Sequence, residues 1–420
     1  MNTSKTNSSI GGMESTDLFS PIRASRDFTA LWLGQTMSLF GDTVLWVALP
    51  LTVLQSSNAT LQLGITMSLF MIPQILLLPF TGVLVDRTSR TRIMIITDVI
   101  RFCLVSILAL LYFEHWMDET ILNGFVLIYG VMKALFNPAY SGARQQVFTP
   151  AIRNAAISLS QTSAQIARLL GPALGGVVVG LGSPSAGFAL DALMLLASVI
   201  SLMFLRIPTP KNMKSIQGAR GYFDELLGGY YAVRSHPWLW ITILAFAFLS
   251  IASMGLTTIL VPWLVKVHLR LSDISYGLVN SATGIGALIS AFIYSRRRTW
   301  NHRAYIAYGG LATNALAICG LSFVHTTLML MLMMAVASAG TMMFGVVWEG
   351  SMQELISSEA YGRAASLDYF GSWVLLPVGN IFTGWLASQI GGVHTIWLES
   401  SFMVLVTIVT MAVPGVRSYN

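Results

Sequence analysis

The sequence predicts an all-α membrane protein with twelve transmembrane helices in two six-helix halves. Of the 420 residues, 55% are hydrophobic and only 10% are charged, whereas a soluble chain carries about 25% charged residues. The apolar runs suit helices that cross a bilayer, which need about 20 residues, and are too long for barrel strands of about 10 residues. The longest polar connection, 206–236, separates six runs from six.

The twelve apolar runs are the expected membrane spans. They are 28–54, 62–85, 93–113, 121–142, 156–180, 185–205, 238–265, 273–294, 304–323, 327–348, 364–390 and 394–414. Pro50 and Pro262 are compatible with such spans, because neighbouring helices can satisfy the carbonyls that a proline frees. The two cysteines, Cys103 and Cys319, both fall inside spans, so we expect no disulfide framework.

The polar segments set the domain boundaries and the orientation. We expect a disordered segment 1–27, a first bundle 28–205, a linker 206–236, a second bundle 237–414 and a tail 415–420. Nineteen of the 24 Lys and Arg residues lie in segments on the side of the two termini. The positive-inside rule therefore predicts cytoplasmic termini in the plasma membrane. The net charge of +6 is explained by an anionic membrane surface, and we expect no nucleic-acid partner.

The two halves resemble each other in sequence. A shift of 208 positions aligns eight residues in and between the fourth and fifth spans with identical residues in the region of the tenth and eleventh, including Gly142 with Gly350 and Gln145 with Gln353. Two halves related by an axis along the membrane normal are a plan of secondary transporters, which hold substrate near the midplane between the halves.

Charge is concentrated in TGVLVDRTSRTRIM, residues 81–94, between two apolar runs. Gly82 removes a side chain where another helix can approach closely. One turn later, Asp86 can accept from the free N–H groups of a helix N-terminus and meet its positive dipole end. The arginines of this stretch can also be explained by the positive-inside rule alone, which asks for no acid there.

Two stretches carry a resemblance to a known family. GVLVDRTSRTR, 82–92, resembles the loop between helices two and three of the major facilitator superfamily, G-x-L-x-D-R-x-G-R-[RK], although Ser89 stands where Gly is usual. IARLLGPALGG, 166–176, is similar to the G-P-x-x-G-G motif in helix five of exporters of that superfamily. Further stretches of the sequence, such as FNPAYSGARQQVFTP, are similar to sequences of the branch that contains macrolide and enterobactin exporters.

The resemblance implies the major facilitator fold and roles for both motifs. In the first motif, Asp86 would meet the start of the eleventh span, and Arg87 and Arg90 would pair with a carboxylate such as Asp98, forming a cytoplasmic gate that also involves Gly82. In the second, the helix-five motif would seal the halves against leak. The residues of this second motif are Gly171, Pro172, Gly175 and Gly176. Ordinary tight packing of small residues is the alternative explanation.

Ionisable residues inside spans are the candidates for proton or substrate binding, because each costs about 2.5–3.5 kcal/mol at a helix centre. Asp42 can pair with Lys133 or with Arg168 across the cavity. Burial favours the protonated form of a carboxylate and a nearby cation favours the ionised form, so an alternately paired acid can carry a proton. A permanent structural pair is the alternative. Glu349 and Asp368 are further candidates, at an inner gate.

The sequence therefore predicts a secondary active transporter that exports small amphipathic molecules, drug-, macrolide- or siderophore-like, by proton antiport with alternating access. We expect no enzyme, cofactor or metal, because the sequence contains no GxxxxGK[ST] motif and no metal-ligand cluster. Its partners would be the substrate, protons and the lipid bilayer, and we expect it to work as a monomer. A non-transporting receptor or scaffold and a nutrient importer are the alternatives.

Overall fold

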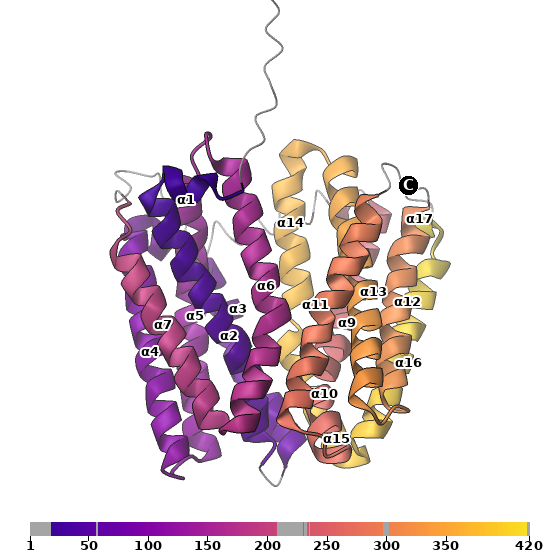
Figure 1. Cartoon of the computed structure of the whole chain (residues 1–420). Coiled ribbons are helices and arrows are strands. Elements are labelled where there is room, and N and C mark those ends of the chain that lie inside the picture. The colour runs from indigo at the N-terminus through magenta and orange to yellow at the C-terminus, as the bar shows by residue number, and fades with distance from the viewer. Residues whose placement is uncertain are drawn as a thin grey trace, which may run out of the picture.

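A computed structural model of the chain describes residues 18–55, 58–207, 236–296 and 302–417, together with 230, 233 and 234. Within these residues, twelve helices are long and apolar enough to cross a membrane. This confirms the all-α class and the twelve expected spans. Figure 1 shows the helices running side by side in one bundle, with the early and late parts of the chain in different halves of the view.

The helices before the central linker begin and end within a few residues of the expected bounds. They are α2 (Arg26–Val53), α3 (Ala59–Arg87), α4 (Arg90–Phe113), α5 (Glu119–Val147), α6 (Arg153–Leu181) and α7 (Pro184–Met203). Helix α2 is buried over much of its length because α6 and α7 both pack on it. Its start is fixed by Ser25, whose hydroxyl accepts from the backbone N–H of Phe28 at 3.1 Å, as an N-cap residue does.

The helices after the linker include two irregular ones. They are α9 (Pro237–Gly255), η1 (Leu256–Leu260), α10 (Val261–Trp263), η2 (Leu264–His268), α11 (Asp273–Ser295), α12 (Arg303–Leu321), α13 (Thr327–Leu355), α14 (Ser358–Trp373), α15 (Leu376–Ile390) and α16 (Gly392–Ala412). Segments η1 and η2 are π-helical and flank Pro262, which has no N–H to donate. Near Pro377, the eleventh span breaks into α14 and α15.

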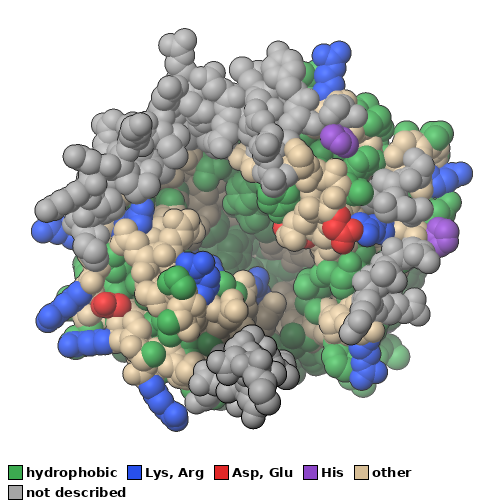
Figure 2. All heavy atoms as spheres, turned by 90° about the horizontal axis from the view of Figure 1, so that it is seen from above, with side chains coloured by type: hydrophobic (Ala, Val, Ile, Leu, Met, Phe, Trp, Pro, Cys, Tyr) green, Lys and Arg blue, Asp and Glu red, His purple; other side chains and the backbone are tan. Residues whose placement is uncertain are grey.

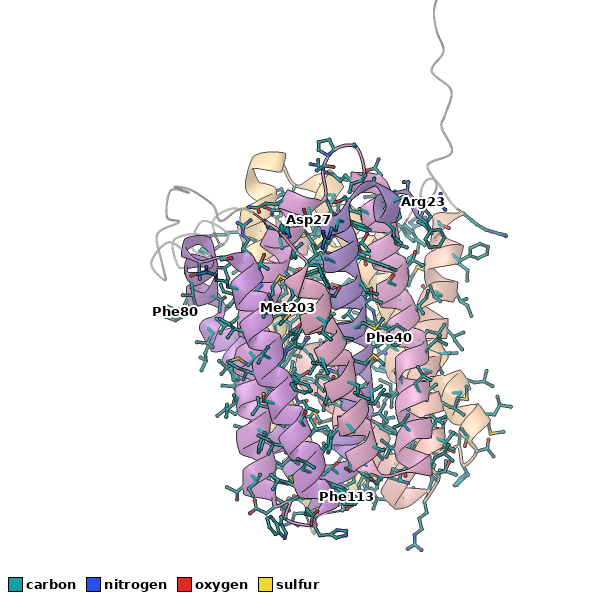
Figure 3. All side chains as sticks on the ribbon, turned by 60° about the vertical axis from the view of Figure 1, so that its left-hand side comes forward. Arg23, Asp27, Phe40, Phe80, Phe113 and Met203 are labelled. Carbon is teal, nitrogen blue, oxygen red and sulfur yellow. The ribbon has the colours of Figure 1, made fainter. Side chains whose placement is uncertain are left out.

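Two short helices mark one end of the bundle. Helices α1 (Ser20–Ala24) and α17 (Pro414–Arg417) lie at this end, which we call the α1 end. In Figure 3, Arg23 and Asp27 lie at the α1 end, Phe113 lies at the opposite end and Phe40 lies between them. The described part of the segment expected to be disordered is therefore helical over Ser20–Ala24, and α2 begins at Arg26. Most of the expected linker 206–236 falls outside the described residues.

The parts of the chain before and after the linker meet along two helix pairs. Helix α6 packs on α11, and α3 packs on α15. The closest approaches lie toward the opposite end, where α3 and α11 begin and α6 and α15 end. At the α1 end, Figure 2 shows a face that is hollowed in its middle, with hydrophobic side chains around the hollow.

Candidate functional site

An ion-pair network is buried between α2, α4 and α5. The Asp42 carboxylate of α2 forms an ion pair with the Lys133 ammonium of α5, and the Tyr129 hydroxyl donates to Asp42 Oδ1 at 2.8 Å. Tyr129 and Lys133 are four residues apart on α5, which places both on one face of that helix. Of the two partners that the sequence allowed for Asp42, the structure therefore selects Lys133.

Arg101 of α4 lies at the centre of this network, fully buried. Its guanidinium pairs with Asp98 one turn earlier and with Asp42 Oδ1 at 3.4 Å, and it donates to Ser38 Oγ at 3.2 Å. It also lies 5.0 Å from the centre of the Phe136 ring, a cation–π distance. The three-residue spacing on one helix predicts the pair with Asp98, but it gives no sign of the contacts of Arg101 with Asp42 and Ser38.

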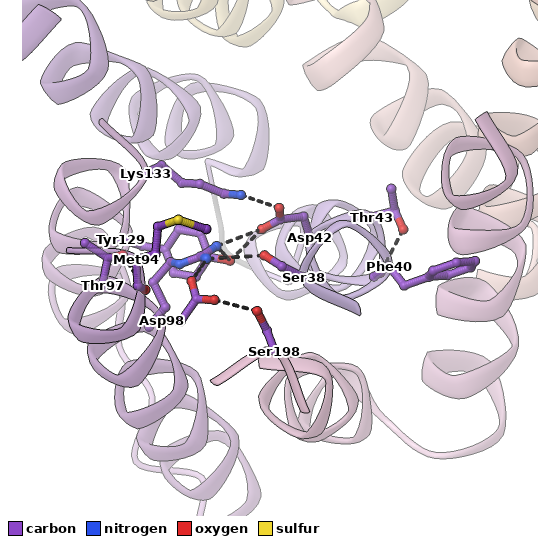
Figure 4. A network of polar contacts seen from close by, with 11 residues as sticks. Ser38, Phe40, Asp42, Thr43, Met94, Thr97, Asp98, Tyr129, Lys133 and Ser198 are labelled. Atoms are coloured by element: carbon purple, nitrogen blue, oxygen red, sulfur yellow. Dashed lines mark hydrogen bonds and ion pairs between the residues drawn. The ribbon is translucent and has the colours of Figure 1, made fainter. Parts of the chain in front are cut away.

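Asp98, which the resemblance places in the gate, belongs to the network around Arg101. One of its carboxylate oxygens is paired with Arg101, and the other accepts from the Ser198 hydroxyl of α7 at 2.6 Å. Figure 4 shows Asp98 turned toward Ser198, while Lys133 reaches Asp42 from the other side. The described partners of Asp98 are thus Arg101 and Ser198, and its expected pairing with Arg87 or Arg90 stays a prediction.

The remaining parts of the expected gate are only partly described. The side chains of Gly82, Asp86 and Arg87 lie outside the described residues, so their contacts stay a prediction. Arg90 is buried, and its guanidinium donates to the backbone carbonyl of Gly142 on α5 at 2.9 Å. This bond ties the start of α4 to α5 within the first half of the chain.

A central cavity of about 390 Å³ lies between the two halves. Its walls come from α2, α6, η1, α11 and α13, and Trp46 and Arg168 are among its lining residues. The Arg168 side chain is exposed and stands away from the ion-pair network, so the alternative pairing of Asp42 with Arg168 is not formed. Asp42 and Thr43 point to opposite sides of α2 (Figure 4), and Thr43 faces the central cavity.

The four residues of the helix-five motif lie against two different helices. Gly171 approaches Thr43 of α2, and a Cβ at Gly175 would lie 3.2 Å from the Cα of Val44. A Cβ at Gly176 would lie 2.8 Å from the Cα of Gly277 on α11. Pro172 presents its carbonyl to Gly277. The motif therefore lets α6 approach both its own half and the other half closely.

Helices α3 and α15 form the second close approach between the halves. A Cβ at Gly64 would lie 2.5 Å from the carbonyl oxygen of Asn380. The Ser68 hydroxyl donates to the carbonyl of Pro377 at 2.7 Å, and the Asn380 amide donates to Met71 Sδ at 3.5 Å. Pro377 lies in the first turn of α15, so the bond from Ser68 ties α3 directly to the start of α15.

The two acidic candidates of the second half connect α13 and α14. Glu349 Oε1 accepts from the Tyr361 hydroxyl at 2.7 Å and from the Gln353 amide at 2.8 Å. The bond to Glu349 raises the pKa of Tyr361, so this hydroxyl stays a neutral donor at physiological pH. Asp368 accepts from the Trp348 indole at 3.1 Å. These contacts lie within the second half, and neither acid joins the Asp42 network.

Two further acidic residues are buried inside the bundle, outside the Asp42 network. Asp191 of α7 is fully buried against Gly41, and neither of its oxygens has a hydrogen-bond partner among the described residues. Glu399 of α16 is also buried, and it accepts from the Thr383 hydroxyl at 2.7 Å. The sequence gives little sign of either site, because a single acid in an apolar helix does not reveal which face it occupies.

Twelve spans, a central cavity and buried charges beside it define a multi-pass membrane transporter fold. The chain belongs to the transmembrane secretion effector family, whose family model matches residues 16–419. It is 23% identical over 404 residues to macrolide efflux protein A of Streptococcus pyogenes, covering 94% of this chain and 97% of that protein. It is also 23% identical over 285 residues to multidrug resistance protein 1 of Bacillus subtilis, covering 66% of this chain and 68% of that protein.

Solved structures show the same fold. The nucleoside transporter NupG superposes with a TM-score of 0.69 at 14% identity, covering 92% of this chain and 99% of that one. A bacterial homologue of the iron transporter ferroportin, in an inward-facing state, gives a TM-score of 0.68 at 17% identity over 92% and 99% of the two chains. The family and its relatives are transporters and not enzymes, and the resemblance to the major facilitator superfamily is confirmed.

Proposed function

We propose that the protein exports small amphipathic molecules by proton antiport with alternating access. The contact between Asp42 and Lys133 carries this proposal. The two side chains remain 11% and 12% exposed, whereas Arg101 on the other side of Asp42 is fully buried. One partner of Asp42 is therefore fixed inside the bundle, and the other lies where water and protons have access.

Asp42 can carry a proton because its two cationic partners differ in this way. While Lys133 is in place, two cations and the Tyr129 hydroxyl stabilise the ionised carboxylate. If α5 moves relative to α2 during transport, Lys133 leaves and the semi-buried carboxylate gains a proton in compensation. The proton then biases the conformational equilibrium, since it binds the separated state better than the paired state.

Three observations support export from the cytoplasm. Most Lys and Arg residues lie in segments at the α1 end, which favours a cytoplasmic location for that end and for both termini. The α1 end is hollowed in Figure 2, and the close contacts between the halves lie toward the opposite end. This arrangement corresponds to a cavity that takes up molecules from the cytoplasm. In addition, the family name and the similarity to macrolide efflux protein A support efflux, and we propose the plasma membrane as its location.

Proton release from energised inside-out vesicles tests the proposal. Vesicles with the parent protein should take up an amphipathic dye against its gradient and release protons when the dye is added. The Asp42→Asn variant should lose uphill transport and keep part of the downhill movement. Asparagine retains an oxygen that can accept from Tyr129 but cannot release a proton at these pH values.

The control is Glu114→Gln, which removes an exposed carboxylate at the end of α4 and should transport normally. Equal uphill transport and an unchanged pH dependence in the Asp42 variant would exclude Asp42 as the proton site. Absence of flux for every substrate tested would favour a receptor or scaffold, and accumulation in right-side-out vesicles would favour an importer.

A further inference from the structure

We propose that Arg168 binds the negatively charged head of an amphipathic substrate in the central cavity, and that the apolar body of this substrate crosses η1 into a second cavity. The inference rests on the proposed transport function and names its substrate class. It needs a free cation in the central cavity, suitable polar groups around it, and an apolar space within reach.

Arg168 is the free cation. It is exposed and is the one charged side chain among the residues described as lining the central cavity. Within the described chain, its guanidinium has neither an ion pair nor a hydrogen bond. A cation at this depth in a membrane protein carries a substantial cost, and an anionic ligand would reduce it through charge-assisted bonds.

None of the described residues that line the central cavity is a carboxylate that could compete for Arg168. Asp42 directly precedes Thr43, which lines the cavity. However, Asp42 points to the opposite side of α2 (Figure 4) and is held by Lys133 and Arg101. A cationic substrate would therefore meet an unpaired positive charge and no free acid in this cavity. The arrangement favours an anion over a cation.

The other polar groups of the cavity direct the anion toward α6. The hydroxyls of Thr257 and Thr258 donate to the carbonyl of Met254 at the end of α9, at 3.0 and 2.8 Å. The hydroxyl of Thr283 donates to the backbone carbonyl one turn earlier on α11, at 2.6 Å. These threonines therefore present oxygen lone pairs, which repel an anion and accept from neutral N–H or O–H groups. Gln165 lies one turn before Arg168 on α6 and also lines the cavity, so the two side chains can donate to the same anionic group.

A second cavity lies beside the first, on the other side of η1. It has a volume of about 340 Å³, and Thr257 of η1 lines both cavities. Its walls include Phe246, Met254, Trp373 and Met403, and none of its described lining residues is charged. Aromatic and methionine side chains adapt to ligands of different shape. A molecule with an anionic head and an apolar body therefore matches the two cavities in order.

Equilibrium binding of two matched probes tests the inference. The purified full chain in phosphatidylcholine nanodiscs is titrated with 1-anilinonaphthalene-8-sulfonate and with its neutral analogue N-phenyl-1-naphthylamine, and tryptophan-excited probe fluorescence is read against empty nanodiscs. Arg168→Gln should weaken binding of the sulfonate about tenfold, as expected for loss of a charge-assisted bond, and should change binding of the neutral probe less than twofold.

Two further variants sharpen the result. Arg168→Lys should restore most of the sulfonate affinity, because it keeps the charge. Arg92→Gln, which changes an exposed arginine at the start of α4, should leave both probes unaffected. Thr257→Leu, which adds bulk where the two cavities meet, should weaken binding of both probes.

The outcomes separate this inference from the proposed function. Equal sulfonate affinity in the parent and Arg168→Gln would overturn the anion site, and unchanged binding in Thr257→Leu would overturn the path of the apolar body. Loss of parent binding in phosphatidylglycerol nanodiscs would assign the site to lipid headgroups and likewise overturn the inference. The assay uses no gradient, so failure of proton antiport in vesicles leaves it unaffected.

Discussion

Arg101 and Lys133 both contact Asp42, yet their surroundings indicate different roles. Arg101 is fully buried and has polar partners on α2, α4 and α5. Among the described residues, Lys133 has one ion-pair partner, Asp42, and it retains some contact with solvent. Arg101 is therefore the fixed centre of the network, and Lys133 is the member that can separate from it.

This difference predicts unequal effects on stability. Arg101→Gln should lower the free energy of unfolding by about 3–5 kcal/mol, because it leaves the buried carboxylates of Asp98 and Asp42 without their cation. Lys133→Gln should cost clearly less, because Arg101 still balances Asp42 and the site is partly solvated. Thermal unfolding of the purified proteins in the same detergent measures both. Equal losses would mean that Lys133 is as structural as Arg101.

The second prediction concerns access to Lys133. In a chain with Cys103 and Cys319 replaced by serine, Lys133→Cys should react with a membrane-impermeant maleimide applied from the α1 end. Substrate should slow this reaction by covering the site or by shifting the conformation. The serine background without the new cysteine is the control. A thiol that stays unlabelled from both sides in all conditions would place Lys133 in a dry helix contact and weaken the case for a movable pair.

At the scale of the single residue, the sequence indicated which ionisable side chains are costly to place inside the membrane, but not in which direction those side chains point. An acid or base inside an apolar run signals function through its cost alone, and this was enough to single out Asp42, Lys133 and Arg168. Whether Asp42 would pair with Lys133 or with Arg168 depended on helix rotation, which the uniformly apolar α2 does not reveal. The three-residue spacing predicts the pair of Arg101 with Asp98, whereas the contact of Arg101 with Asp42 depends on how α2 and α4 pack.

At the scale of the element, α6 combines close packing within its half with close packing across the halves. Gly171 and Gly175 face α2, and Gly176 faces Gly277 of α11. A packing role and a sealing role are therefore not alternatives, because different glycines of one motif serve different neighbours. The sealing role itself remains a prediction that needs a functional test.

Gly277→Ala provides that test. The added Cβ would lie 2.8 Å from the Cα of Gly176, a distance at which the backbones must move apart. We expect a loss of stability of about 1–3 kcal/mol, typical of overpacking, and a measurable proton leak in proteoliposomes. Gly124→Ala is the matched control, because a Cβ at Gly124 would have no neighbour within 4 Å. Tight liposomes with the Gly277 variant would show that this contact does not seal the pathway.

The element boundaries were largely predictable because run length and apolarity set them. All twelve spans appear near their expected bounds, since each span must satisfy its backbone internally. The deviations occur at prolines. Pro262 lies between two π-helical segments, and Pro377 follows a break between α14 and α15. The sequence predicts that Pro262 is compatible with a span and does not predict the break at Pro377. Neighbouring helices decide whether a proline bends, widens or interrupts a helix.

At the scale of the whole molecule, the two related halves differ in chemistry. The position that corresponds to Lys133 in the second half is Thr341, whereas Phe136 corresponds to Phe344. Phe344 stacks on Phe246 with ring centres 5.2 Å apart, where Phe136 instead lies against Arg101. The first half thus holds the ion-pair network and the second half an aromatic cluster. This asymmetry is consistent with proton binding in one half and binding of an apolar substrate body in the other.

Alternating access requires the contacts at the opposite end to open in every cycle, so locking them should stop transport without unfolding the protein. The Cβ positions of Gly180 on α6 and Asp273 on α11 lie 3.6 Å apart, within the range of about 3.5–4.5 Å that a disulfide needs. In the background without native cysteines, Gly180→Cys with Asp273→Cys should cross-link on mild oxidation and lose transport, and a reducing agent should restore it. Each single substitution should transport under both conditions.

The locked protein should still react at a cysteine placed at position 133 from the α1 end, because the lock holds the halves in the arrangement seen here. Undiminished transport by the fully cross-linked protein would show that α6 and α11 need not separate, and the rocking of two halves about the central cavity would have to be abandoned.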